Sequence, residues 1–301
     1  MTLTGLHFLL TYQCLFSCEH CFTWGCPEQQ GTFSLADIEQ TLDQALETKT
    51  IEQVYFEGGE PFLYYPILAG AVHLAAQRGL KPGIVTNGYW ASSPTDAEAW
   101  LRPMAGELED IFISSDLLHY DEIVSPQAHN ALAAAERLSI RANLIVCETP
   151  GAPREATDPE RGQPIEGGSI VYRGRAIPSF AAAAPKLSWD SFTECPYEEL
   201  VEPERLHVDY LGNLHVCQGL LIGNLFTQPL TQIVAEYRPE QHPIVGPLTR
   251  GGPAELMLAH GLVPEPAYAD ACHLCYTARD RLRERFPEQL GPGQMYGEGL
   301  T

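Results

Sequence analysis

The chain has 301 residues, 45% of them hydrophobic, and a formal net charge of −21 at pH 7. This length suits one large domain with a small appendage, and the apolar share is that of an ordinary globular protein. The negative charge argues against nucleic-acid binding and against docking on anionic lipid, so it indicates either a solubilising acidic surface or a basic partner.

Apolar, β-favouring runs alternate with helical patterns through the first 180 residues. Such alternation predicts a parallel sheet wound by right-handed crossovers, here with six βα units. The strands are predicted at residues 6–11, 51–56, 83–86, 111–114, 142–147 and 169–172.

Helical signals fall between these strands. Ser34 followed by Asp37 predicts an N-cap with its reciprocal partner, opening a helix with an apolar face. The other helices are predicted at residues 67–78, 94–104 and 128–138.

The rest of the chain has a different character. Residues 148–168 are rich in Pro, Gly and charge and predict a loop over the sheet or in solvent. Short strands and turns follow, and the Gly-rich end is expected to pack loosely. We therefore predict a first domain at residues 1–180, a second at 186–290 and a tail at 291–301.

Cys14, Cys18 and Cys21 are spaced C-x3-C-x2-C just after the first predicted strand. Three thiolates can hold three irons of a cubane [4Fe–4S] cluster, which leaves the fourth iron without a protein ligand. An open coordination position is typical of catalytic metal sites, and a closed one of structural sites. The alternatives are a zinc site or a set of buried thiols.

This spacing resembles that of the radical S-adenosylmethionine (radical SAM) family, and four further motifs follow in the family's order. The resemblance covers roughly residues 5–180 and implies a partial (β/α)6 TIM barrel, an α/β fold whose chemistry gathers at the C-terminal ends of its strands. The motifs are a GGEP-like run at 57–61, a TNG run at 86–88, the strand end at 114–116 and an RGRA run at 173–176.

The resemblance also implies a SAM site. Glycines at the GGEP motif would let backbone carbonyls approach the methionine amine, and His20 would lie beside the adenine. Arg175 would pair with the SAM carboxylate or be a surface arginine. The implied cofactor-binding residues are His20, Gly58, Gly59, Glu60, Asn87, Ser114, Asp116 and Arg175.

A second cysteine set lies in the C-terminal third, where the run from Gly212 to Cys217 predicts a hairpin turn that leads into a thiolate. This element resembles those of SPASM and twitch domains, which implies a small α+β iron–sulfur domain with a second, fully ligated [4Fe–4S] cluster. A zinc knuckle is the alternative. The proposed ligands are Cys195, Cys217, Cys272 and Cys275.

Radical SAM enzymes cleave SAM reductively to a 5′-deoxyadenosyl radical that abstracts hydrogen from a substrate. The resemblance therefore implies an enzyme acting on a small molecule or short peptide, supplied with electrons by a flavodoxin- or ferredoxin-type donor. A fully ligated auxiliary cluster favours net oxidation. Because the chain begins almost at its first strand, no N-terminal peptide-recognition domain is expected, which tilts the prediction slightly toward a small substrate.

Three alternatives stay open: a redox-neutral epimerase or mutase, a ribosomal-peptide maturase, and a non-catalytic iron–sulfur or zinc scaffold. For the epimerase, Cys147 at the end of the fifth predicted strand would be the catalytic hydrogen donor. Candidates for a general base, by location alone, are His119, Tyr120, Asp209 and Tyr210.

Nine cysteines in a chain of this length are too few for a disulfide scaffold, and their clustering indicates metal binding. No basic N-terminal region or long apolar stretch indicates a signal peptide or a membrane span. A reducing, cytoplasmic location is the expectation.

Overall fold

The computed structural model describes residues 1–148 and 170–299. Its centre is an eight-stranded sheet with the strand order β5-β4-β3-β2-β1-β7-β8-β9. Strands β1 to β5 and β7 pair in parallel, and β8 and β9 extend the sheet as antiparallel strands. These strands are β1 (Gly5–Thr11), β2 (Gln53–Gly58), β3 (Lys81–Thr86), β4 (Asp110–Ser114), β5 (Arg141–Ile145), β7 (Arg205–Asp209), β8 (Asn213–Cys217) and β9 (Leu220–Asn224).

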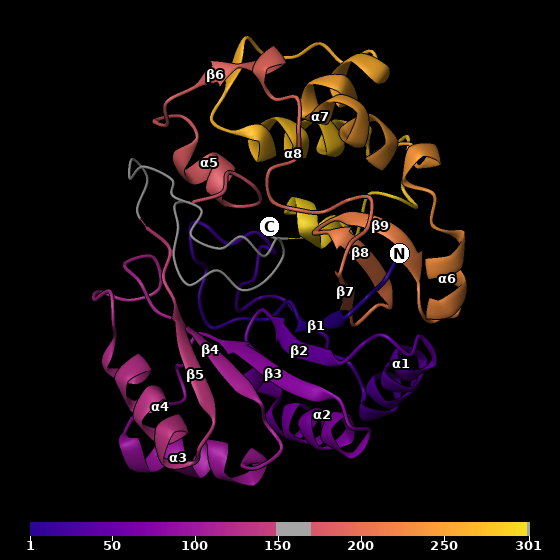
Figure 1. The fold of residues 1–301 in the computed structure, drawn as a ribbon. Helices are drawn as coiled ribbons and strands as arrows, with labels where there is room; N and C mark the ends of the chain where they lie inside the picture. The colour runs from indigo at the N-terminus through magenta and orange to yellow at the C-terminus, as the bar shows by residue number, and fades with distance from the viewer. Residues whose placement is uncertain (149–169, 300–301) are drawn as a thin grey trace.

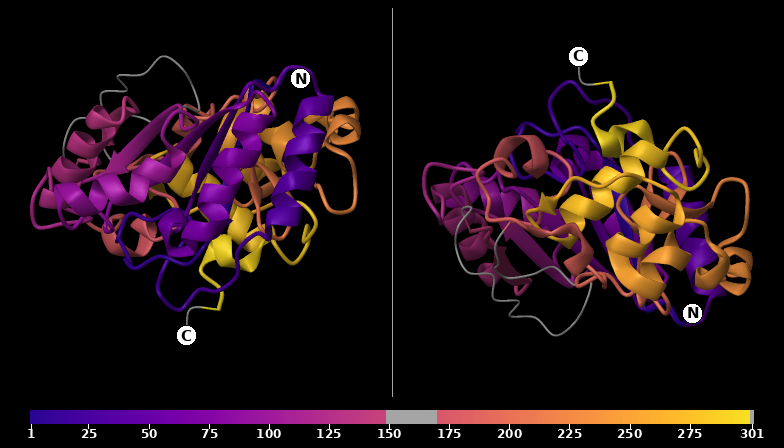
Figure 2. Two further views of the ribbon diagram at one scale, coloured as in Figure 1. Left: turned by 90° about the horizontal axis from the view of Figure 1, so that it is seen from below. Right: turned by 90° about the horizontal axis from the view of Figure 1, so that it is seen from above.

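The helices lie on both sides of this sheet. Figure 1 shows the first four helices below the parallel strands and the C-terminal helices above them, and the two views of Figure 2 agree. A two-stranded sheet of β6 (Leu187–Ser188) and β10 (Ala267–Tyr268) lies among the upper elements. The α-helices are α1 (Leu35–Glu47), α2 (Tyr65–Gln77), α3 (Pro94–Leu101), α4 (Pro126–Arg137), α5 (Ala176–Phe180), α6 (Leu230–Glu236), α7 (Val245–Ala259) and α8 (Ala271–Leu282).

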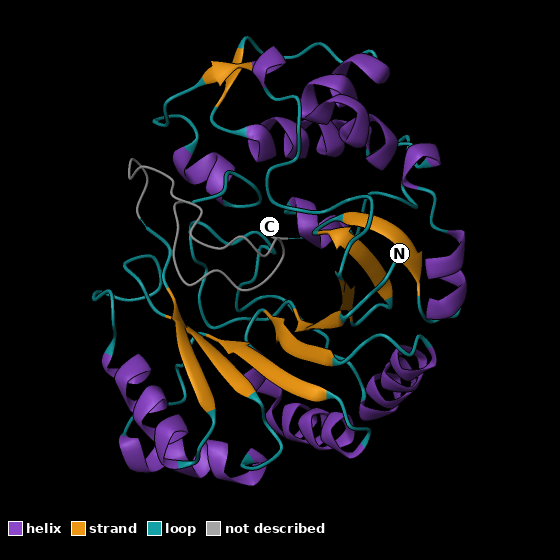
Figure 3. Ribbon diagram, in the orientation of Figure 1, coloured by secondary structure: helices purple, strands orange, loops and turns teal. Residues whose placement is uncertain are grey.

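Strand β1 is the middle of the fold, because it pairs with β2 on one side and with β7 on the other. All seven of its residues are buried. A strand covered on both faces reads as a continuous apolar run, as this one does. Figure 3 shows this sheet between the two groups of helices.

The first five predicted strands and all four predicted helices are confirmed, with shifts of a few residues at their ends. The capping box of α1 is present, because Asp37 N–H donates to Ser34 Oγ at 3.1 Å and Ser34 N–H donates to Asp37 Oδ2 at 3.2 Å. The local sequence signals therefore placed these elements well.

The sixth predicted strand is wrong where it can be compared. Residue 169 lies outside the described residues, and residues 170–172 do not form a strand. The backbone N–H of Tyr172 instead donates to Asp270 Oδ2 at 3.1 Å, so this segment binds the N-cap residue of α8. The (β/α)6 barrel expected from the sequence is here five parallel strands, with β7 added beside β1.

The predicted turn before Cys217 is confirmed. Gly212, whose φ of 82° lies in the region that favours glycine, joins β7 to β8. Since β7–β9 continue the sheet of β1–β5, the boundary near residues 180–186 stays a prediction.

The expected loose tail is wrong for the described residues 291–299. Residues Gly293–Tyr296 form a short 3-10 helix in which Met295 and Tyr296 are buried. Gln294 Nε2 donates to the carbonyls of Thr23 and Trp24, so the tail packs on the cysteine loop. The loop predicted at 148–168 lies outside the described residues except for residue 148. Among the described helices, none has the length and apolar content that crossing a membrane requires.

Candidate active site

The loop that carries Cys14, Cys18 and Cys21 follows β1 and is held against the end of β2. Cys14 N–H donates to the carbonyl of Cys26 at 3.1 Å, which closes the loop. Gly59 N–H donates to the Thr11 carbonyl at 2.7 Å, and Glu60 N–H to the Gln13 carbonyl at 2.8 Å. The predicted glycine motif thus forms a backbone ladder with the cysteine loop.

Gly59 is needed for this approach. A Cβ at Gly59 would lie 2.0 Å from the Gln13 carbonyl oxygen and 2.8 Å from the Tyr12 carbonyl carbon. The absence of a side chain at Gly59 therefore allows two backbone segments to come into contact. The sequence interpretation had explained this glycine by the approach of the backbone to the cofactor.

The three thiols of this loop share one environment. The backbone N–H groups of Phe16 and Gly25 donate to Cys14 Sγ at 3.4 Å and Cys21 Sγ at 3.2 Å. Burial raises the pKa of Cys14 to about 12 and also raises the pKa of Cys18, and Cys21 adds to both shifts. A metal that binds here must displace protons from these thiols.

Arg175 holds the cysteine loop from the other side. Its guanidinium donates to the carbonyls of Cys18 at 2.8 Å and Gly25 at 3.0 Å, and its own N–H donates to the Cys21 carbonyl at 2.9 Å. It lies 5.5 Å from the Trp24 ring. Arg175 is therefore a clamp on the loop, a role that the sequence interpretation missed.

Replacing Arg175 by Lys should loosen this loop, because an ammonium group cannot bridge two carbonyls as the guanidinium fork does. Loss of one charged hydrogen bond, about 1.5 kcal/mol, predicts iron loss to a chelator about tenfold faster in the reconstituted variant. The exposed Arg102→Lys is the matched control. If the Arg175→Lys variant keeps its iron as the wild type does but binds SAM more weakly, the result would instead support Arg175 as a partner of the SAM carboxylate.

Glu60 is buried at the junction of β2 and β3. Its carboxylate accepts hydrogen bonds from Thr86 Oγ1 at 2.8 Å, from Asn87 N–H at 2.8 Å and from Phe62 N–H at 3.0 Å. Burial raises its pKa to about 7, against the effect of these hydrogen bonds. Asn87 turns its amide toward Cys14 Sγ, at 3.6 Å. Glu60 thus joins the two strand ends that carry the predicted SAM motifs.

Asp116 organises the end of β4. Its carboxylate accepts from the N–H groups of Leu118 and Cys147, the latter at 2.8 Å, and it lies 2.8 Å from His119 Nδ1. The His119 and His20 rings are in edge contact, 4.9 Å between centroids. Ser114, one of the predicted ribose contacts, is half-buried at the end of the same strand. Asn87 thus approaches Cys14 directly, and Asp116 is connected to the cysteine loop through His119 and His20.

His20 carries the clearest sign of a missing ligand. Its Nδ1 is buried and has no hydrogen-bond partner among the described residues. Burial lowers the pKa of His20 to about 4, and His119 adds to this shift. A buried polar atom without a partner is costly, so the site fits a bound cofactor with a polar edge beside His20.

The other predicted residues are less favourable as general bases. Tyr120 donates its hydroxyl to the Asn87 carbonyl at 2.7 Å, and Tyr210 donates to the Gln30 carbonyl at 3.0 Å. Asp209 is buried and accepts hydrogen bonds from several groups, among them Tyr12 and Asn213. These three residues are engaged in holding the fold.

The four cysteines of the second set also come together in the structure. Cys272 and Cys275 lie three residues apart near the N-terminus of α8, Cys217 ends β8, and Cys195 lies on the loop before β7. All four line one cavity, together with Arg173 and Arg279.

Both arginines of this cavity are directed at its thiols. Arg173 Nη1 is 3.8 Å from Cys217 Sγ, and the positive charge of Arg279 acts to lower the pKa of Cys275, against the stronger effect of burial. The Nε atoms of both arginines are buried without a partner among the described residues. Since Arg175 clamps the first cysteine loop, the run from residue 173 to 175 joins the two cysteine sites.

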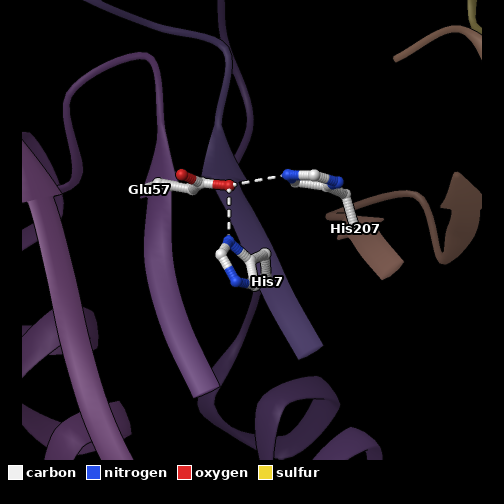
Figure 4. Close-up of side chains that lie close together, drawn as sticks. All are labelled: His7, Glu57 and His207. Carbon is white, nitrogen blue, oxygen red and sulfur yellow. Dashed lines mark hydrogen bonds and ion pairs between the residues drawn. The ribbon is translucent and has the colours of Figure 1, made fainter. Parts of the chain in front are cut away.

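A third group was missed by the sequence interpretation. His7 of β1, Glu57 of β2 and His207 of β7 turn their side chains toward one another (Figure 4). Glu57 Oε1 is 3.2 Å from His7 Nδ1 and 3.1 Å from His207 Nε2. His7 lies in the first predicted strand and Glu57 directly follows the second, which was a usable signal, but no predicted strand contained His207.

Comparison with known proteins finds a similarity to the radical SAM superfamily in the N-terminal part of the chain. Residues 8–122 match the family model of the radical SAM superfamily. The chain is 24% identical over 141 residues, 46% of its length, to YydG of Bacillus subtilis (strain 168), named as a candidate peptide biosynthesis protein. It is 31% identical over 114 residues, 38% of its length, to MJ1632 of Methanocaldococcus jannaschii, named as a candidate glycyl-radical enzyme activating enzyme.

The chain spans less than half of both curated relatives, 44% of YydG and 40% of MJ1632. Among solved structures, it is similar to Streptococcus suis SuiB bound to S-adenosylmethionine, with a TM-score of 0.53 and 13% identity. That match covers 85% of this chain and 74% of SuiB. At this identity the similarity concerns the fold, a parallel-dominated α/β sheet consistent with a partial TIM barrel.

Proposed function

We propose that this protein is a radical SAM enzyme that abstracts hydrogen from a short peptide and oxidises it. The observation that carries the proposal is the loop of Cys14, Cys18 and Cys21. Backbone hydrogen bonds from Gly59 and Glu60 hold the start of this loop, and all of these residues lie in the segment that matches the family model. The similarity to YydG, a protein named for peptide biosynthesis, supports a peptide substrate over a small molecule.

A [4Fe–4S] cluster with SAM on its open iron would supply a 5′-deoxyadenosyl radical for hydrogen abstraction. Cys14, Cys18 and Cys21 would hold three irons, and Arg175 keeps their loop in place through the Cys18 and Gly25 carbonyls. Of the remaining predicted contacts, His20 would hold the nucleotide through Nδ1, which has no hydrogen-bond partner in the part of the chain that the structure describes.

The proposed net oxidation rests on the second cysteine set. Four thiolates around a [4Fe–4S] core in its 2+ state carry a net charge of 2−, and the guanidiniums of Arg173 and Arg279 can compensate it. Compensating charges favour the reduced form of the cluster, which suits an electron acceptor.

The spacing of the sulfurs favours this cluster over the zinc alternative. In the described residues there are two groups of three potential metal-ligand atoms in which all three atoms lie within 4.8 Å of one another. Neither group contains a cysteine. A tetrahedral zinc ion with Zn–S bonds of about 2.3 Å brings its thiolates to roughly 3.8 Å. A cubane cluster accepts more widely spaced sulfurs.

The test is anaerobic reconstitution with iron and sulfide, followed by incubation with SAM and dithionite or a reduced flavodoxin-type donor. We expect about eight irons per chain for two clusters, and release of 5′-deoxyadenosine measured by chromatography. Full iron loading without SAM cleavage would contradict the enzyme proposal and favour a scaffold.

A redox-neutral epimerase is the second candidate, favoured by the position of Cys147. This residue follows β5, and its N–H binds Asp116, which in turn contacts His119 beside His20. Cys147 is thus connected to the proposed SAM site through two polar contacts.

The outcome with Cys147→Ala separates the two candidates. If oxidation is the reaction, the variant should form product at a rate within about twofold of wild type, because the thiol takes no part in it. Product made in D2O should then carry no solvent deuterium. Deuterium in the product, together with loss of product in the variant, would favour the epimerase.

A further inference from the structure

We propose that His7, Glu57 and His207 form a binding site for zinc or another divalent transition-metal ion, separate from both cysteine sites. The ligand atoms are His7 Nδ1, Glu57 Oε1 and His207 Nε2, which all lie within 4.8 Å of one another. They project from the neighbouring strands β2, β1 and β7 onto one side of the sheet (Figure 4).

The register of the strands makes this meeting possible. His7 lies opposite His207 in the pairing of β1 with β7, and opposite Tyr55 in the pairing with β2. Glu57 lies two residues after Tyr55, so the period of a strand brings its side chain to the same face. The Tyr55 ring packs on the His7 ring at 4.7 Å, which fixes the imidazole. Strands hold such ligands more firmly than loops do.

The two distances from Glu57 fit a coordination sphere and are longer than those of strong, charge-assisted hydrogen bonds. Ligands about 2.1 Å from an ion lie roughly 3.0 Å apart at an octahedral angle and roughly 3.4 Å apart at a tetrahedral angle. The two separations from Glu57 Oε1, 3.2 and 3.1 Å, fall between these values. Charge-assisted N–H···O bonds are shorter, about 2.7–2.9 Å.

Hydrogen bonding alone cannot satisfy both polar neighbours of His207 at once. Its Nε2 lies 3.2 Å from Arg205 Nη1, which can only donate, and 3.1 Å from the Glu57 carboxylate, which when ionised can only accept. One nitrogen cannot carry a hydrogen for Glu57 and a lone pair for Arg205 at once. An ion would take the single Nε2 lone pair of His207 and a lone pair of Glu57, and Arg205 would then keep Glu198 as its partner instead of His207.

The charges and protonation states suit a cation. Arg205 lies 3.6 Å from Glu198, a carboxylate that it shares with Arg173 at 3.5 Å, and Glu57 supplies the negative charge among the three proposed ligands. The side chains of His7 and His207 are 2% and 5% exposed, and an imidazole binds a metal through the nitrogen lone pair of its neutral form.

Two neutral histidines and one glutamate are the protein ligands of known catalytic zinc sites, which keep a further position open. Here the Glu57 side chain is 16% exposed, whereas His7 and His207 are nearly closed off. The open position would lie on the Glu57 side, one residue before Gly58 and the predicted SAM motif. A substrate oxygen or nitrogen could reach the ion there.

The experiment is a titration of the cluster-loaded protein with Co2+ under anaerobic conditions, followed by visible absorption. We expect one Co2+ per chain, with ligand-field bands of nitrogen and oxygen ligation and without thiolate charge transfer. Glu57→Gln and His207→Gln should each weaken binding more than tenfold, since loss of an outer-shell partner alone costs about 10–100-fold.

His73→Gln is the matched control, because His73 pairs with Glu107 at 2.7 Å on the surface without a third ligand. It should bind Co2+ as the wild type does. If wild-type protein takes up no such Co2+, the proposal is wrong whether or not the variants fold, and the group is a hydrogen-bonded cluster. Equal affinity in Glu57→Gln and wild type would also overturn it. Since SAM cleavage is not the readout, this result is independent of the proposed function.

Discussion

Replacing Cys14, Cys18 and Cys21 together by alanine is expected to reduce 5′-deoxyadenosine formation to the level of a protein-free blank. These thiols would be the protein ligands of the SAM-binding cluster, and no iron can then hold the cofactor. The iron content of the reconstituted variant should fall from about eight to about four per chain, because the second cysteine set is intact. Product analysis and iron determination on the same sample test both numbers.

Cys26→Ser is the matched control for this variant. Cys26 belongs to the same loop and is buried, but its contribution to the loop is the backbone carbonyl that accepts from Cys14 N–H. Serine preserves that carbonyl, so iron content and SAM cleavage should stay close to wild type. Cleavage that persists in the triple variant would refute the radical SAM mechanism for this chain.

Gly59→Ala is expected to disrupt the same site without removing a ligand. The added Cβ would meet the Gln13 carbonyl oxygen at 2.0 Å, and the neighbouring atoms are all backbone, which cannot rotate away. Overpacking usually costs about 1–3 kcal/mol, and here we expect the upper end of that range or more. The backbone hydrogen bonds from Gly59 and Glu60 to the cysteine loop should break, and the first site should lose iron.

Thermal unfolding and iron content of the reconstituted variant are the measurements. Gly5→Ala is the control on the same sheet, since its Cβ would have the Arg205 Cβ as nearest neighbour at 3.5 Å, an ordinary contact. We expect this control to change stability by less than about 1 kcal/mol. A Gly59→Ala protein with wild-type stability and full iron would show that the loop tolerates displacement from β2.

The elements of the first half were predictable because their signals are local. The Ser34 and Asp37 cap lies within one turn of the helix that it begins, and the apolar runs of β1–β5 need no knowledge of their partners. The motif of Cys14, Cys18 and Cys21 could be recognised for the same reason, because these three proposed ligands are only a few residues apart.

The candidate site was predicted as a set of residues, and the structure adds contacts that the sequence did not indicate. The carboxylates of Glu60 and Asp116, which are predicted SAM contacts, also join strand ends and turns. Arg175, predicted as a partner of the SAM carboxylate or a surface arginine, holds the loop backbone. Spacing along the chain identifies which residues meet, but not which backbone groups compete for their hydrogen bonds.

By itself the sequence determined the strands and helices of the first half, the first cysteine motif and the family resemblance, because each depends on residues close together in the chain. Only the tertiary structure decided that β7 adds to β1 and that residues 170–172 turn toward α8. The meeting of His7, Glu57 and His207 follows from that addition. Such contacts join segments far apart in sequence, and they form where packing and register bring the strands together.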